Sequence, residues 1–170
     1  MLRLRVTLAV VLIAVVSTPL GAMPVTTARL RPQSSRIRAW LAHGREHSPT
    51  VRALADRVER SDVVVYLELD WTPEAGVLAC VTWMSAAPGV RYLRVSMRAD
   101  LRLSDGVAML AHELQHVVEV ADHLDVRSND ELTALYQRIG HRAGSSGRAW
   151  DTLAALRAGD LARRDLSTAA

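Results

Sequence analysis

The chain has 170 residues, a length that accommodates one domain and a short targeting segment. It is 49% hydrophobic and 23% charged, a balance that excludes an intrinsically disordered protein. The net charge is only +3 and the arginines are scattered, so we expect no nucleic-acid partner. The single cysteine, Cys80, excludes an intramolecular disulfide.

Residues 1–22 have the pattern of a secretory signal peptide. Arg3 and Arg5 precede an uninterrupted apolar run, Pro19 ends that run, and small residues follow it. We expect this segment to direct export to the periplasm, the cell surface or the medium, and to serve as a membrane anchor only if it stays uncleaved. Residues 23–47 are expected to form a lead-in to the folded domain.

The next part of the chain predicts a helix followed by a small sheet. Ser48 and Pro49 supply a hydroxyl cap and a first-turn proline, and apolar residues then recur at helical spacing. Three runs rich in β-branched residues follow, at 63–69, 77–84 and 91–97. Because short turns containing proline and glycine separate them, we predict a three-stranded, mainly antiparallel sheet.

From Ser104 onward the pattern is helical. Helices are predicted over 104–121, over 129–139, where Gly140 ends the second, and over 148–164. The expected fold class is therefore α+β, with an N-terminal helix, a small sheet and a helical C-terminal half.

The helix predicted over 104–121 carries the residues with the most informative chemistry. Its apolar residues share one face, and the roughly opposite face carries His112, His116, Glu119 and His123. Two imidazoles four residues apart can bind one metal ion. Glu113 lies beside them, where a carboxylate can take a proton from an activated water molecule. The pattern therefore predicts a metal site.

The segment 111–119, AHELQHVVE, resembles the active-site helix of the zincin metallopeptidases. The resemblance implies Zn²⁺ bound by His112 and His116, Glu113 as the general base, a small sheet before the helix and a helical part after it. It also implies a single zincin-like domain over 48–170. The glycine and third histidine that continue the metzincin motif are absent, which favours a gluzincin-like site with a glutamate as third ligand.

The third ligand stays open between two glutamates. Glu119 lies on the histidine stripe, but in a straight helix it is one turn beyond the metal and could instead orient His116. Glu131 lies on the next helix, as the third ligand of gluzincins does, but it also forms a capping box with Ser128. Weaker candidates are Asp122, Asp125 and His123.

The residues that would stabilise a transition state are less clearly marked. Tyr136, His141 and Arg142 lie in the appropriate part of the chain, although Tyr136 also belongs to the apolar face of its helix. We expect an exported zinc-dependent metallopeptidase that hydrolyses a peptide or protein substrate. The alternative is a non-catalytic exported protein that uses a zincin-like scaffold to bind metal or a partner.

Overall fold

The computed structural model of the protein describes residues 28–71, 77–143 and 149–168. The signal-peptide segment and the glycine-containing stretch 144–147 lie outside the described residues. In chain order the elements are β1 (Leu30–Pro32), α1 (Ser35–His47), α2 (Pro49–Glu59), β2 (Val63–Asp70), β3 (Ala79–Ala87), β4 (Val90–Arg98), α3 (Leu103–Asp122), α4 (Asn129–Ile139), β5 (His141–Ala143), β6 (Ala149–Asp151) and α5 (Leu153–Thr168).

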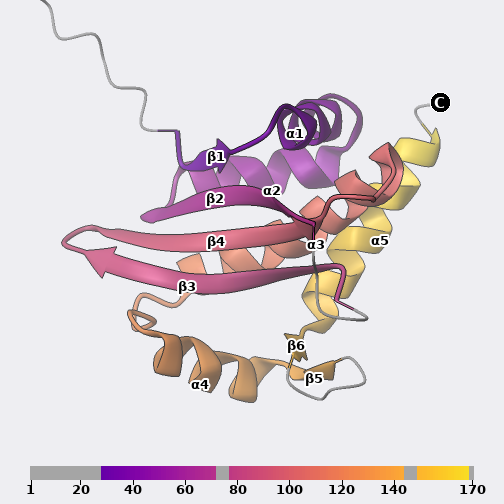
Figure 1. Ribbon diagram of the computed structural model, residues 1–170. Helices are drawn as coiled ribbons and strands as arrows, with labels where there is room; N and C mark the ends of the chain where they lie inside the picture. Colours follow the sequence, from indigo (N-terminus) through magenta and orange to yellow (C-terminus); the bar gives the residue numbers. More distant parts are fainter. Residues whose placement is uncertain (1–27, 72–76, 144–148, 169–170) are drawn as a thin grey trace, which may run out of the picture.

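The main sheet is mixed and has the strand order β1-β2-β4-β3 (Figure 1). β2 pairs in parallel with both β1 and β4, whereas β3 pairs antiparallel with β4. The prediction of a three-stranded, mainly antiparallel sheet was therefore wrong, although the α+β class is correct. A second, two-stranded sheet of β5 and β6 was not predicted.

The residues of β2 explain why this strand lies inside the sheet. Val63, Val64 and Val65 are consecutive, and all three are buried. Such apolar runs are typical of strands with parallel neighbours, and from Val65 to Glu68 β2 alternates between buried core residues and half-buried residues on the open face of the sheet. β3 has no buried residue and alternates between half-buried and exposed residues from Ala79 to Met84, in keeping with its place at the edge. Gly89, with a φ of 74°, allows the tight turn between β3 and β4.

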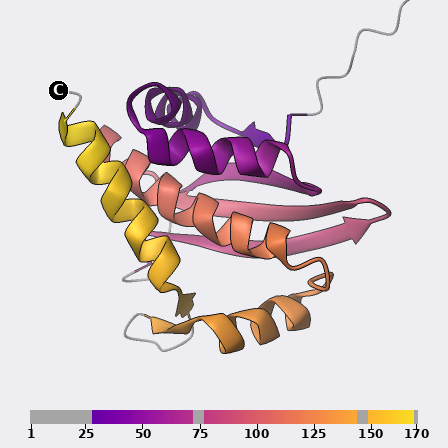
Figure 2. The same ribbon diagram turned by 180° about the vertical axis from the view of Figure 1, so that it is seen from behind.

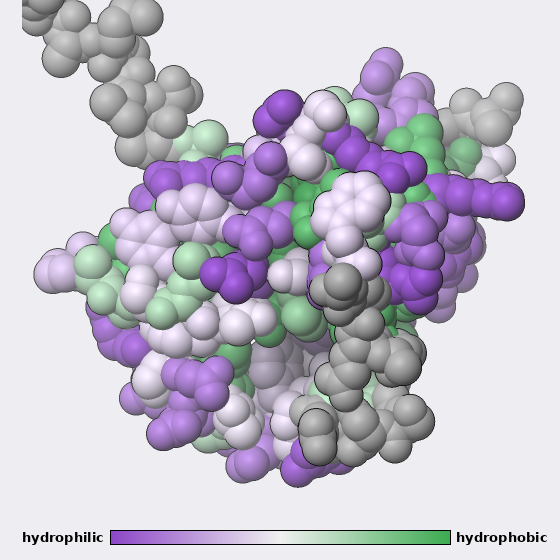
Figure 3. All heavy atoms as spheres, in the orientation of Figure 1, coloured by the Kyte–Doolittle hydropathy of each residue, from purple (hydrophilic) through white to green (hydrophobic). Residues whose placement is uncertain are grey.

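Helices α1, α2 and α3 lie on one face of the sheet, α5 packs against α3 and α2, and α4 lies along the β3 edge (Figure 2). Leu93, Val95 and Met97 of β4 point into the core between these layers. Ile37 and Trp40 of α1 are buried there too, so the segment expected as a lead-in contributes to the core. The opposite face of the sheet carries polar groups such as the Arg94–Glu68 ion pair and is turned toward the viewer in Figure 3.

Local signals in the sequence located the ends of α2, α3 and α4, whereas the helix predicted over 148–164 begins only at Leu153, because Ala149–Asp151 form β6. The Ser48 hydroxyl accepts the N–H of Val51 at the start of α2, and the Ser128 hydroxyl accepts that of Glu131 at the start of α4. Both caps were predicted.

None of the helices in the described part of the chain combines the length and the apolar character needed to cross a membrane.

Arg91 of β4 is fully buried and joins the sheet to the end of α3. Its guanidinium makes two hydrogen bonds to the Asp62 carboxylate, at 2.8 and 2.7 Å, and holds the pKa of that carboxyl below its ordinary value. It also donates to the backbone carbonyls of Val120, Ala121, His123 and Val126. Carbonyls at and just beyond the end of a helix are short of donors, and Arg91 supplies donors here in addition to the backbone N–H groups that Val120 and His123 already accept.

Arg91→Met should lower the free energy of unfolding by about 3–5 kcal/mol, because it leaves a partly buried carboxylate without its charged partner and several carbonyls with one donor fewer. Urea denaturation at neutral pH measures this loss. The matched control is Arg94→Met on the polar face of the same strand, where loss of an exposed ion pair should cost less than about 1 kcal/mol. Equal losses in the two variants would contradict the role given to Arg91.

Candidate metal centre

Helix α3 presents His112 and His116 on one side, one turn apart. Their Nε2 atoms are 3.2 Å apart, and the two rings lie edge to face with centroids 4.9 Å apart. The remaining sides of α3 are largely buried, with Leu110 and Leu114 fully inside the core. Because that packing sets the rotation of the helix, the two imidazoles are held side by side.

The third member of the cluster is Asp151, the last residue of β6. Its Oδ1 atom lies 3.3 Å from His112 Nε2 and 3.5 Å from His116 Nε2. Among the described residues, these are the three His, Cys, Asp or Glu side chains whose ligand atoms all lie within 4.8 Å of one another. The three residues lie close enough together to bind one metal ion.

The two Nε2 atoms and Asp151 Oδ1 are spaced like the ligand atoms of a tetrahedral metal site. Nitrogen and oxygen ligands about 2.0–2.1 Å from a tetrahedral ion are themselves roughly 3.3–3.4 Å apart. The three separations in the cluster, 3.2, 3.3 and 3.5 Å, agree with that value. The donor set of two imidazoles and one carboxylate would leave a fourth position open.

The end of α4 and the β5–β6 hairpin determine where Asp151 lies. At Gly140, which ends α4, a Cβ atom would lie 2.7 Å from the Asp151 carbonyl oxygen, so the close approach requires glycine. His141 pairs with Asp151 across the hairpin, and residues paired in this way project to the same side. His141, a predicted site residue, is therefore next to the cluster.

Helix α5 follows β6 and packs closely on α3. Its buried face consists of small residues, namely Ala155, Ala158, Gly159 and Ala162. A Cβ atom at Gly159 would lie 3.3 Å from the Ala108 carbonyl and 3.6 Å from His112 Cβ. This near contact of the two helices keeps the start of α5, and Asp151 before it, beside the histidines.

Glu119 lies on the far side of His116 from Asp151 Oδ1. His116 Nδ1 donates to Glu119 Oε2 at 2.9 Å, and the Thr152 hydroxyl donates to Glu119 Oε1 at 2.7 Å. Burial opposes ionisation of Glu119, but these two hydrogen bonds outweigh it and hold the pKa of the carboxyl below its ordinary value. A proton on Nδ1 leaves the Nε2 lone pair of His116 directed at the cluster.

The two histidines differ in their affinity for protons. Burial disfavours the charged form of His116, but its hydrogen bonds with Asp151 and Glu119 outweigh burial and raise its pKa to about 9. Burial, followed by the charge of His116, lowers the pKa of His112. A metal ion must therefore displace a proton from His116, so metal affinity should fall as the pH is lowered.

Glu113 lies in α3 between the two histidines and is only 3% exposed. Its Oε2 atom is buried and has no hydrogen-bond partner. Burial raises the pKa of the carboxyl to about 7. An unpaired buried carboxyl that titrates near neutral pH is unusual in a purely structural position and is typical of a functional acid or base.

The other candidates from the sequence are engaged elsewhere. Glu131 accepts the N–H of Arg127 and the Ser128 hydroxyl, so it caps α4 and does not join the cluster. Tyr136 donates to the His116 carbonyl at 3.2 Å, and burial raises the pKa of its phenol. The weaker candidates also lie outside the cluster: Asp122 bonds to Arg57, His123 donates to the Glu119 carbonyl, and Asp125 is exposed.

Comparison of the chain with protein-family models, with curated proteins and with solved structures found no match.

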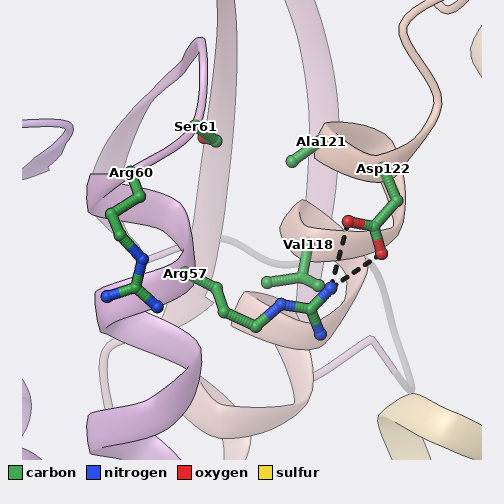
Figure 4. A pocket seen from close by; sticks show the side chains of 6 residues that line it. All are labelled: Arg57, Arg60, Ser61, Val118, Ala121 and Asp122. Carbon is green, nitrogen blue, oxygen red and sulfur yellow. Dashed lines mark hydrogen bonds and ion pairs between the residues drawn. The ribbon is translucent and has the colours of Figure 1, made fainter.

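A shallow pocket between α2 and α3 is separate from the cluster (Figure 4). It is lined by Arg57, Arg60, Ser61, Val118, Ala121 and Asp122. Arg57 makes two hydrogen bonds to Asp122 across it, at 3.0 and 2.8 Å, so the charges of this pair largely neutralise each other. The pocket contains none of the three cluster residues.

Asp151→Ala should reduce zinc affinity by at least about 100-fold, since it removes one of three converging donors. Competition with a chromophoric chelator measures the affinity. Glu131→Gln on α4 is the control and should bind zinc as the unaltered protein does. Loss of zinc from the Glu131 variant, with normal binding by the Asp151 variant, would reverse the assignment of the third donor.

Glu113→Gln should stabilise the metal-free protein at pH 8 more than at pH 5. The native carboxyl keeps its proton up to about pH 7, whereas its ordinary pKa is 4.5. The native state therefore loses stability as the pH rises between these values, by roughly 1–3 kcal/mol, and glutamine escapes that loss. Urea denaturation in the presence of chelator measures the free energy of unfolding of both proteins at each pH. Equal stabilisation by Glu113→Gln at pH 5 and pH 8 would contradict a cost of ionising the buried Glu113 carboxyl.

Proposed function

We propose that the protein is a zinc-dependent peptidase that acts outside the cytoplasm. The observation that carries the proposal is the convergence of His112, His116 and Asp151 next to Glu113, a buried carboxyl with an unpaired oxygen. The signal-peptide pattern of residues 1–22 supports export. The zincin-like segment 111–119 supports the peptidase assignment.

The donor set favours zinc over calcium and magnesium. Two imidazoles and one carboxylate are ligands that zinc accepts readily, whereas calcium and magnesium prefer oxygen ligands alone. Three protein ligands with a fourth position open are typical of catalytic zinc, because structural zinc sites are closed by four side chains. Asp151, rather than a glutamate, would supply the oxygen ligand in this protein.

When bound, zinc supplies a Lewis acid that lowers the pKa of water and polarises a carbonyl group. Glu113 in its ionised form would take the proton from the attacking water and pass it to the leaving amine. Its pKa near 7 suits both transfers at neutral pH. His116 would keep its Nε2 lone pair in place through the hydrogen bond to Glu119.

His141 is the candidate that we favour for contact with the reacting carbonyl. It is exposed and pairs with Asp151 across the β5–β6 hairpin, so its side chain is on the same side as the cluster. The Tyr136 hydroxyl, by contrast, is buried and donates to a backbone carbonyl. A cationic or donor side chain beside the centre would stabilise the oxyanion that forms when a peptide bond is attacked.

The edge strand β3 supports a peptide as the substrate. β3 packs against α3, the helix that carries His112 and His116. The outer edge of β3 has no strand partner among the described residues. Because α4 packs against part of this edge, an extended peptide could add through backbone hydrogen bonds only along the part of β3 that α4 leaves free.

Glu113→Gln should keep zinc and lose peptide hydrolysis by about 10²–10⁴-fold, because the variant retains the donors and lacks the base. Cleavage of a mixture of synthetic peptides, followed by mass spectrometry, measures activity beside zinc content. Glu131→Gln again serves as the control with unchanged activity. A fully active Glu113→Gln protein would contradict the mechanism, and an unaltered protein that binds zinc but cleaves no peptide would support the non-catalytic alternative.

A further inference from the structure

We propose that Thr152 is a positioning residue for the metal centre, whose single hydroxyl sets where Asp151 and His116 lie relative to each other. The inference rests on the proposed function only in requiring that the centre binds zinc. The Thr152 side chain contacts none of the three converging donor atoms.

The Thr152 hydroxyl makes two hydrogen bonds that join different parts of the fold. It donates to Glu119 Oε1 at 2.7 Å and accepts the N–H of Ala155 at 3.1 Å. The first bond reaches α3, and the second caps the first turn of α5. Thr152 is only 3% exposed, so water does not readily replace either partner.

The hydrogen bonds that link Ala155, Thr152, Glu119 and His116 allow one arrangement of protons. An ionised carboxylate only accepts, so Glu119 requires hydrogens from both Thr152 and His116. The Thr152 hydrogen is directed to Glu119, which leaves an oxygen lone pair for the N–H of Ala155. The His116 hydrogen that faces Glu119 is on Nδ1, so Nε2 is the nitrogen that can give up its proton and bind a metal ion.

The same residue also orients Asp151. The backbone N–H of Thr152 donates to Asp151 Oδ1 at 2.7 Å, and this oxygen is the one that approaches both histidines. Thr152 therefore contacts the carboxylate donor through its backbone and reaches one imidazole donor through Glu119. Loss of the hydroxyl would free the start of α5 from α3 and leave Glu119 Oε1 with only the longer hydrogen bond from Gln115 Nε2, at 3.5 Å.

Thr152→Val and Thr152→Ser separate the hydroxyl from the shape of the side chain. Valine is close to threonine in shape but has no hydroxyl, whereas serine keeps it. We expect Thr152→Val to bind zinc about 10–100-fold more weakly and Thr152→Ser to restore affinity to within about 3-fold of the unaltered protein. Chelator competition measures both. In the metal-free protein, the ¹⁵N NMR signal of His116 Nδ1 should shift in the valine variant and not in the serine variant.

A matched control distinguishes positioning from a general loss of stability. The Ser48 hydroxyl likewise donates to a carboxylate, that of Asp165 at 2.6 Å, and caps a helix by accepting the N–H of Val51 at 3.2 Å. It is buried and is not part of the centre. Ser48→Ala should lower the melting temperature as Thr152→Val does, and it should leave zinc affinity unchanged.

The outcomes separate this inference from the proposed function. Unchanged zinc affinity in Thr152→Val, or an equal loss in Ser48→Ala, would overturn the positioning role while the proposed function stands. An unaltered protein with no affinity for zinc would overturn both. Weak binding by the valine variant alone, with rescue by serine, is the result that supports the role.

Discussion

The buried guanidinium of Arg91 ties the last turn of α3 to β4, and the metal centre depends on the position of that helix. Such a charge is costly to bury unless it is fully paired, and Asp62 together with backbone carbonyls supplies the pairing. Because α3 is held by Arg91 at one end and by apolar packing along its length, His112 and His116 have little freedom to turn away from Asp151. The rigidity of the site therefore originates in contacts outside it.

The centre collects three carboxyl groups in a small, mostly buried volume, and their surroundings give them different properties. Hydrogen bonds and nearby histidines outweigh burial at Asp151 and Glu119 and lower the pKa of each. Glu113 has no such partner at Oε2, and its pKa is raised. Carboxyls whose environments drive their pKa values apart are suited to separate roles, which in the proposed function are a ligand, a support for His116 and a base.

Segments distant in the chain meet at this centre through close backbone approaches. Gly140 lets the end of α4 contact the Asp151 carbonyl, and Gly159 lets α5 lie against α3 near His112. Thr152 then joins α5 to α3 by a hydrogen bond to Glu119. The carboxylate donor is thus placed by helix packing and by the hairpin together, and each of these contacts would be disturbed by a larger side chain.

The sequence by itself determined the features that depend on neighbouring residues. Caps at Ser48 and Ser128 act over three residues through backbone hydrogen bonds, and the spacing of His112 and His116 places both on one helix face whatever surrounds it. The strand order and the place of Asp151 in the cluster were decided only by the tertiary structure. An aspartate before threonine at the start of a helix is also an ordinary capping pattern, and nothing local distinguishes it from a metal donor. Which distant carboxylate reaches the histidines depends on how the whole chain buries its apolar surface, because that burial sets the pairing of β2 with β4 and the packing of α5 on α3.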